Sequence, residues 1–544
     1  MVHRSYNTHV LIVGGGPVGM SLALDLKYRD VDFLLVEASD GSVFHPKVST
    51  VGPRSMELFR RWGIADRIRS AGWPGDHTLD AAWVTAVGGH EVYRLEFGTA
   101  DSRPLPPHTP EPEQCCPQHW LAPLLMREVG VYPDGPMRTR CRLDSFVQYV
   151  DRVVATITDL ADGSVLTVHA RFMVACDGAS SSVRKTCGVT ALARHKTRVF
   201  RNILFRAPRL REQLGQHNAL VYFLMMSSSL RFPMRALDGR NLYRLTVGVD
   251  GSPSASDDAM SLVSSAIALD TPLEVLSDNE WHLTHRVADQ FRVGRIFLAG
   301  DAAHTLSPSG GFGMNTGISS AADLGWKLAA DLDGWAGPGL LDTYEAERQP
   351  IAVGSLEEAN VNLVRTMKRE VPPELHLDSP EGKRARAEMA RRLEHSDVRR
   401  EFDAPGIHFG FRYSSPIVVA EPAVPAAAAN GGGWRQSAAP GSRAPHAWLR
   451  PGTSTLDLFG RGFVLLCFAE SDRRQGVEQA FAERCIPLET TVCHDVRVAE
   501  LYERLFVLVR PDGHVAWRGD ALPSDAGWLA DKVRGAGQAV MSGR

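Results

Sequence analysis

The feature that most constrains the fold is a glycine-rich turn at residues 14–19, which reads Gly-Gly-Gly-Pro-Val-Gly. It follows an apolar run at 9–13 that predicts a strand, and it opens a run at 17–28 that predicts a helix. A second apolar run, 31–37, predicts another buried strand and ends in Glu37, an acid about 20 residues after the turn. This order of elements is the βαβ unit that binds a dinucleotide, whose adenosine ribose can donate to the acid.

Each position of the turn has a physical reason in that unit. Gly14 permits the tight turn, Gly16 lets a pyrophosphate approach the backbone, and Gly19 lets the helix lie close to the sheet. The helix begins at Pro17 and Val18, and its free N–H groups and positive dipole end would face the phosphates. We therefore expect these five residues to bind the nucleotide.

Two further segments place an acid directly after a predicted strand. The run 295–299 leads into Gly-Asp at 300–301 and then into a glycine-rich loop at 307–315. Asp301 can hold a ribityl hydroxyl, and the bare N–H groups of the loop can lie against a flat polar ring. The helix that follows would favour a negative charge on that ring, so the pattern indicates FAD. Cys-Asp-Gly at 176–178 again sets an acid between a strand and a helix.

In this order and spacing, the three segments resemble the class A FAD-dependent aromatic hydroxylases, the para-hydroxybenzoate and phenol hydroxylase superfamily, over about residues 8–360. The resemblance implies that Asp177 and Gly178 serve both FAD and NAD(P)H, and that Asp301 holds the ribityl chain. It also implies that Pro308 lies beside the flavin C4a position. The residues implied to line the flavin ring are Gly311, Gly313, Met314 and Asn315.

Two more cofactor contacts follow from the same resemblance. Gln118 precedes a predicted helix and matches a polar flavin contact of the phenol hydroxylase branch. Lys47 stands in a loop where many relatives carry arginine. Lysine is a point donor and cannot make the planar bidentate contact of arginine, but it can still reach the flavin or a phosphate.

The reaction implied by the resemblance is hydroxylation of a phenolic or related electron-rich aromatic ring. NAD(P)H would reduce FAD, O2 would be captured as a flavin C4a-hydroperoxide, and this species would transfer a hydroxyl group to the substrate. The alternatives are a flavin-dependent reductase or dehydrogenase without oxygen transfer, and a flavin-binding protein without activity. The chain carries no Gly-x-Ser-x-Gly, His-Glu-x-x-His or Walker motif that would indicate other chemistry.

The substrate-side residues are less constrained by the pattern. Besides Pro308, we expect Tyr222 and Arg235 to act in catalysis, because the predicted sheet that carries them would cover the flavin. Arg235 could pair with an anionic substituent, while sheet packing or a surface ion pair is the alternative for both. Trp73 and His77 are candidates for a pocket wall, and His304 is either a site residue or a structural hydrogen-bonding group.

The whole chain is predicted to be α/β, with a Rossmann-type FAD-binding domain, an inserted β-sheet substrate domain and a C-terminal thioredoxin-like domain. The tail resembles the appendage of the phenol hydroxylase branch but lacks Cys-x-x-Cys, so we expect it to serve packing or homo-oligomer formation. The assigned ranges are 1–80, 100–190 and 285–360 for FAD binding, 81–99 and 191–284 for the substrate sheet, 361–418 for a helical extension, 419–433 for a linker, and 434–544 for the thioredoxin-like domain.

Composition excludes several other classes. With 60 Lys+Arg against 63 Asp+Glu, the net charge of −3 provides no basic field for nucleic acid. No uninterrupted apolar run reaches the roughly 20 residues of a membrane span, so we expect no stable membrane insertion. The 8 cysteines show no zinc-type spacing, which predicts reduced thiols, no metal and a cytoplasmic protein. The expected partners are a small aromatic substrate and O2.

Overall fold

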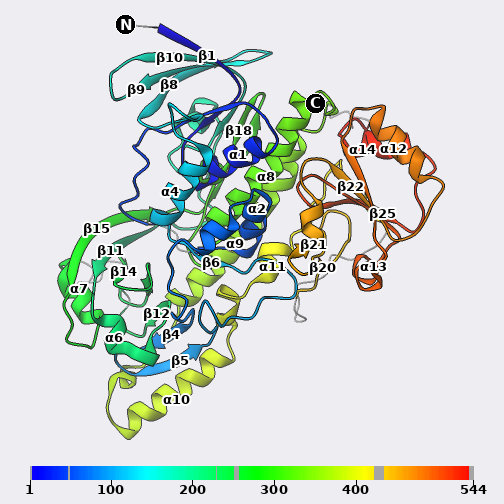
Figure 1. Ribbon diagram of the computed structural model, residues 1–544. Helices are drawn as coiled ribbons and strands as arrows, with labels where there is room; N and C mark the ends of the chain where they lie inside the picture. Colours follow the sequence, from blue (N-terminus) through cyan, green and yellow to red (C-terminus); the bar gives the residue numbers. More distant parts are fainter. Residues whose placement is uncertain (1–2, 47–49, 228, 250–256, 422–433, 538–544) are drawn as a thin grey trace.

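The computed structural model describes residues 3–46, 50–227, 229–249, 257–421 and 434–537, and these fold around three β-sheets (Figure 1). The first sheet has the order β17-β18-β10-β1-β2-β7, and β9 and β8 extend it from β10. Its central pairs, β1 with β10 and with β2, and β10 with β18, are parallel. Its strands are β1 (His3–Val13), β2 (Phe33–Val36), β7 (Met137–Arg138), β8 (Cys141–Gln148), β9 (Val153–Asp159), β10 (Val165–Ala175), β17 (Arg292–Val293) and β18 (Ile296–Leu298).

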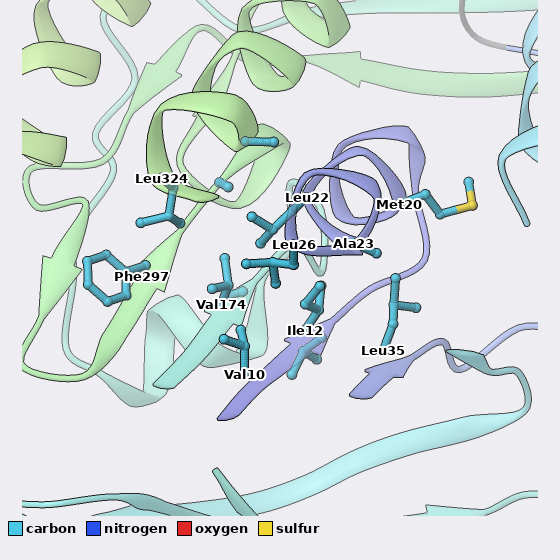
Figure 2. Packing of buried hydrophobic residues seen from close by; sticks show 14 of the residues in the cluster. Val10, Ile12, Met20, Leu22, Ala23, Leu26, Leu35, Val174, Phe297 and Leu324 are labelled. Atoms are coloured by element: carbon cyan, nitrogen blue, oxygen red, sulfur yellow. The ribbon is translucent and has the colours of Figure 1, made fainter. Parts of the chain in front are cut away.

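Helices cover this sheet with small and apolar residues that are buried against it. In α1 (Pro17–Tyr28), Leu22 and Leu26 are fully buried and lie over Val10 and Ile12 of β1 (Figure 2). The helix has the bounds that the sequence predicts, and α8 (Phe312–Leu332) packs beside it. The other helices of this part are α2 (Pro53–Arg61), α3 (Ala65–Arg69), α4 (Gln118–Val129), α5 (Ser182–Thr186) and α9 (Thr343–Met367).

The second sheet has the order β15-β11-β14-β13-β12-β4-β5. Its strands are β4 (Ala81–Val84), β5 (Glu91–Leu95), β11 (Arg198–Arg206), β12 (Val221–Leu224), β13 (Pro233–Ala236), β14 (Leu242–Gly248) and β15 (Glu274–Leu283). They come from inside the two segments predicted for a substrate sheet, while the domain boundaries themselves stay a prediction. The helices α6 (Leu210–Leu214), α7 (Ala259–Ala266), α10 (Pro380–Glu394) and α11 (Pro405–Phe409) lie in this part of the chain and in the segment after α9.

The third sheet belongs to the C-terminal unit and has the order β23-β22-β24-β25. Its elements are β22 (Phe463–Cys467), α12 (Arg474–Ala482), β23 (Leu488–Val492), α13 (Val496–Tyr502), β24 (Phe506–Val509), β25 (Val515–Gly519) and α14 (Ala526–Val533). The unit packs on α8, where the Trp326 ring meets Phe463 edge to face. Most of the predicted linker, residues 422–433, lies outside the described residues.

Short strand pairs complete the fold. They are β3 (Thr50–Val51) with β6 (Gln114–Cys115), β16 (Arg286–Val287) with β19 (His304–Thr305), and β20 (Trp448–Arg450) with β21 (Thr453–Ser454). Within the described ranges, no helix combines the length and the apolar character needed to cross a bilayer.

Candidate cofactor and active site

The three predicted cofactor segments meet at the carboxyl ends of β1, β2 and β10. Gly14 has a φ of +108°, and a Cβ built on it would overlap the carbonyl oxygen of Cys176, directly before the Asp-Gly turn. A Cβ on Gly19 would overlap the carbonyl oxygen of Gly14. A Cβ on Gly16, by contrast, would meet no atom of the described chain within 4 Å. Gly14 and Gly19 therefore allow close packing, while Gly16 leaves an open surface at the start of α1.

The Gly-Asp turn at 300–301 joins the same place. A Cβ on Gly317 of α8 would lie 2.5 Å from Val18 Cγ2 and 3.3 Å from the Cα of Gly300. Gly300 itself has a φ of +60° and faces the Val18 side chain. The first turn of α1, the 300–301 turn and α8 are thus held together by glycines at their points of contact. Asp301, which follows, has an exposed side chain.

The acids that follow β2 and β10 are fixed by backbone N–H groups. Glu37 Oε2 accepts from Gly15 N at 2.7 Å, and Oε1 accepts from Ser39 N at 2.7 Å. Asp177 Oδ2 accepts from Ser182 N at 2.8 Å, at the start of α5. Asp177 Oδ1 is buried, and among the described residues it has no hydrogen-bond partner. This oxygen is an acceptor that a cofactor hydroxyl could satisfy.

A glycine-rich loop forms the N-terminal cap of α8. Gly311 adopts a left-handed conformation with a φ of +68°, and a Cβ there would meet nothing in the described chain within 4 Å. Its N–H donates to the carbonyl oxygen of Pro308 at 2.9 Å, and the Pro308 ring is exposed. The first turn of α8 contains Gly313 and the buried Met314. The open glycines and free helix N–H groups can accommodate a flat ring with polar edges.

Asn315 has a role that the sequence pattern did not indicate. Its Oδ1 accepts from Gly52 N at 2.8 Å and from Ser55 Oγ at 2.7 Å, and its Nδ2 donates to Gly311 O at 2.7 Å. The side chain therefore ties the cap of α8 to the start of α2, and its polar atoms are engaged within the protein.

Three predicted cofactor residues remain, and the structure describes two of them. Gln118 is the first residue of α4, and Gly178 has a φ of +81° with open space around its Cα. Lys47 lies outside the described residues, so its predicted contact stays a prediction.

The predicted catalytic residues on the second sheet lie on opposite faces. Tyr222 pairs with Met234, and both belong to the core on the side of α6 and α7. The Tyr222 hydroxyl accepts from Ala219 N at 2.7 Å, and the side chain is fully buried. Arg235 pairs with Val221 on the other face. The geometry therefore does not bring Tyr222 and Arg235 together, because adjacent residues of a strand point to opposite sides.

The Arg235 face contacts the loop that follows β2. Arg244 is the cross-strand neighbour of Arg235, and its Nη1 donates to Pro46 O at 2.7 Å, in the loop after β2. Burial lowers the pKa of Arg235 and lowers that of Arg244 to about 10. This face thus carries two adjacent, half-buried guanidinium groups.

The segment after α9 adds a third arginine to this face. Arg369 lies 5.5 Å from the Phe223 ring centre and 5.9 Å from that of Trp83, two rings that stack at 4.9 Å. Burial lowers the pKa of Arg369 to about 10 and raises that of Glu401, which interacts with Arg235 and Arg369. Sequence reasoning missed Arg244, Arg369 and Glu401, because no local motif marks them.

The two histidine candidates are buried, and the tryptophan candidate Trp73 is half-buried. The ring of His304 stacks on Phe291, and burial lowers its pKa to about 4, so it is neutral near pH 7. Neither of its ring nitrogens has a hydrogen-bond partner among the described residues. The His77 ring packs edge to face on Trp73, and its Nδ1 lies 2.6 Å from Thr78 O.

Comparison with known protein families finds one match in the N-terminal part of the chain and one in the C-terminal unit. The FAD binding domain family matches residues 7–359, and the aromatic-ring hydroxylase C-terminal family matches residues 437–538. Tetracenomycin B2 monooxygenase-dioxygenase of Streptomyces olivaceus is 32% identical over 96% of this chain and 97% of its own length. RebC soaked with chromopyrrolic acid and holding a bound 7-carboxy compound is 67% identical, with a TM-score of 0.95 over 98% of this chain and 100% of that one. The flavin-dependent monooxygenase PieE, in complex with FAD and substrate, is 28% identical, with a TM-score of 0.85 over 97% of this chain and 99% of that one. The chain therefore belongs to the family of FAD-dependent aromatic-ring hydroxylases.

Proposed function

We propose that this chain oxidises a fused-ring aromatic acid, with FAD as cofactor, NAD(P)H as electron donor and O2 as oxidant. The observation that carries the proposed substrate class is the pair of adjacent, half-buried arginines, Arg235 and Arg244, on the sheet face that contacts the loop after β2. The planar fork of a guanidinium matches the two oxygens of a carboxylate. The likeness to RebC, whose structure was obtained with chromopyrrolic acid, supports an acidic substrate.

The apolar part of the same face suits a flat, extended ring system. Trp83 and Phe223 are fully buried and stack with an interplanar angle of 9°. Arg369 lies against both rings, and its Nη1 is a buried donor with no hydrogen-bond partner among the described residues. An aromatic acid could accept from Arg369 at the edge of this apolar wall, whose buried rings would help to exclude water from the reacting ring.

The proposed cofactor contacts follow from the open positions in the site. Gly16 and the start of α1 would hold the pyrophosphate, Glu37 and Asp177 would accept from FAD hydroxyls, and Asp301 would hold the ribityl chain. FAD, when bound, supplies the hydride and oxygen chemistry. The loop Pro308–Gly311 and the N-terminus of α8 would stabilise negative charge on the ring.

Several finer assignments belong to the proposal as well. A single glycine-rich βαβ unit is visible in the sequence, so NAD(P)H would bind transiently near Asp177 and Gly178. The order β23-β22-β24-β25, with β22 and β23 parallel and the others antiparallel, supports a thioredoxin-like C-terminal unit without a redox role. Tyr222 is not part of the proposed site. A homo-oligomer and a cytoplasmic location stay predictions from the sequence.

The test combines oxygen labelling with a change of the proposed carboxylate site. Holoenzyme is incubated with NADH or NADPH, ¹⁸O2 and chromopyrrolic acid, and the product is analysed by mass spectrometry. We expect substrate-stimulated NAD(P)H oxidation and one ¹⁸O atom in the product. Arg235→Gln should raise KM by about 10-fold or more, while Arg206→Gln, an exposed arginine of the same sheet, should not.

Two outcomes would contradict the proposal. NAD(P)H oxidation that yields only hydrogen peroxide, with no ¹⁸O in any aromatic product, would favour the reductase alternative. An unchanged KM in Arg235→Gln would remove the assigned carboxylate site while leaving the flavin chemistry intact.

A further inference from the structure

A polar cavity lies between α2 and the C-terminal unit, apart from the cofactor segments. It has a volume of about 140 Å³. Figure 1 shows α2 in the middle of the molecule, next to the segment of β20 and β21. The cavity is lined by Tyr28 at the end of α1, by Arg54, Glu57, Arg60 and Arg61 of α2, and by Pro110, Leu456, Asp457 and Phe459.

Most charges around the cavity are already paired. Arg60 binds Asp457 at 2.7 Å and Glu111 at 3.1 Å. Glu57 accepts from Arg54 at 2.8 Å and from Arg443 at 2.9 Å, so two guanidinium groups share this one carboxylate.

Arg61 differs from its neighbours. Across the described ranges, no carboxylate oxygen lies within 4.0 Å of its guanidinium, and its Nη1 donates to the carbonyl oxygen of Pro511 at 3.1 Å. The acid that acts on it through space, Asp25, is already paired with Arg29 at 2.7 Å. Arg61 is half-buried, and burial together with the nearby Arg54 lowers its pKa to about 10.

A second observation points to a missing acceptor in the same cavity. Arg54 is only 5% exposed, and its Nε is buried with no hydrogen-bond partner in the part of the chain that the structure describes. A buried N–H group of a guanidinium destabilises the folded protein unless a hydrogen-bond acceptor satisfies it. Together, Arg54 and Arg443 bring two positive charges against the carboxylate of Glu57, and Arg61 adds a third positive charge to the lining of the cavity.

We propose that this cavity binds a small inorganic oxyanion, phosphate or sulfate, between Arg61 and Arg54. Guanidinium forks match the oxygen spacing of such ions and bind them through charge-assisted hydrogen bonds. The space is well below the roughly 300–1,000 Å³ of pockets that enclose larger organic ligands, so a free ion fits and a nucleotide does not. Because Arg61 also contacts Pro511, the bound ion would join α2 to the C-terminal unit.

The test is thermal unfolding of the FAD-loaded full chain in phosphate, compared with chloride at equal ionic strength. Saturating phosphate should raise Tm by about 2–5 °C, and sulfate should do the same, since only the native state has the cavity. Isothermal titration calorimetry should give one phosphate per chain.

The matched variants separate this site from general salt effects. Arg61→Gln should abolish both the Tm rise and the calorimetric signal, and in chloride it should be at least as stable as the original chain, because the unmatched cation is gone. Arg497→Gln is the control. This side chain lies in the C-terminal unit and is 84% exposed, so the variant should keep the full Tm rise. The flavin absorbance confirms that each variant retains FAD.

An equal Tm rise in Arg61→Gln and in the original chain would overturn the proposal, as would the absence of any rise in the original chain. If Arg61→Gln does not fold, Arg61→Lys serves instead. Lysine keeps the charge and loses the fork, so the phosphate affinity should fall by about 10-fold. An unchanged affinity in that variant would equally contradict the assignment.

Discussion

Arg510 of the C-terminal unit donates to Glu347 of α9 with an Nη1–Oε1 distance of 2.6 Å, and both side chains are completely buried. Arg510 Nη2 also reaches Asp323 of α8 at 3.0 Å, and Lys327 lies between the same two acids at 2.8 and 2.7 Å. Both α8 and α9 thus depend on a cation from a distant part of the chain.

Removing this cation should destabilise the whole enzyme. Arg510→Met would leave Lys327 as the one cation paired with Glu347 and Asp323 among the described residues, and breaking a buried pair in this way costs about 3–5 kcal/mol. Urea unfolding of the holoenzyme, followed by circular dichroism, measures the loss. Arg497→Met, which removes an exposed pair with Asp495, should cost no more than about 1 kcal/mol. Equal losses in the two variants would show that the buried cluster has no special weight.

The two glycines of the cofactor turn should respond differently to alanine. Gly16 has a φ of −68° and open space around its Cα, so Gly16→Ala should fold normally and lose FAD affinity, because the methyl group would occupy the phosphate surface. Gly19→Ala should unfold the turn, since its Cβ would overlap Gly14 O. Fluorescence titration of the apoprotein with FAD, together with Tm, distinguishes the two. Normal FAD affinity in folded Gly16→Ala would argue against the assigned phosphate position.

Asp301→Ala should weaken FAD binding while the fold persists. The loss of a charge-assisted hydrogen bond costs about 1.5–3 kcal/mol, which corresponds to about 10- to 150-fold in Kd. FAD titration is the measurement, and Asp333→Ala, an exposed acid after α8, is the control. An unchanged Kd in Asp301→Ala would mean that the 300–301 turn does not hold the ribityl chain.

Acid should destabilise the protein through its buried histidines. Burial lowers the folded pKa of His304 to about 4, below the ordinary value of 6.5. The unfolded chain therefore binds a proton that the folded chain does not, and stability falls as pH drops from 6.5 toward 4, by about 1.4 kcal/mol per pH unit for one histidine. His304→Phe keeps a ring against Phe291 and should reduce the slope by one proton. Unfolding free energies across this pH range, with an identical slope in the variant, would refute a neutral His304.

The sequence predicted the parts of the site that depend on local rules. The helix at 17–28 follows from its periodicity and the turn before it, and the glycines of that turn follow from backbone sterics. The meeting of the three cofactor segments follows from parallel strands, whose carboxyl ends share one edge of the sheet.

What could not be predicted depends on register and on distant contacts. A strand pattern does not say which face meets the cofactor, and a shift of one residue reverses the answer, as Tyr222 and its neighbour Val221 illustrate. The hydrogen bonds of Asn315 to Gly52 and Ser55 span more than 250 positions of the chain. No local pattern could reveal them.

The insertion of Arg510 between α8 and α9 also limits how such enzymes can be recombined. The acids that receive it, Asp323 and Glu347, are encoded far upstream of the C-terminal unit. A chimaera that takes this unit from one relative and the rest from another would bury unmatched charges unless both halves came with compatible partners. Grafting experiments, and evolution by exchange of gene segments, must therefore transfer the acids and the arginine together.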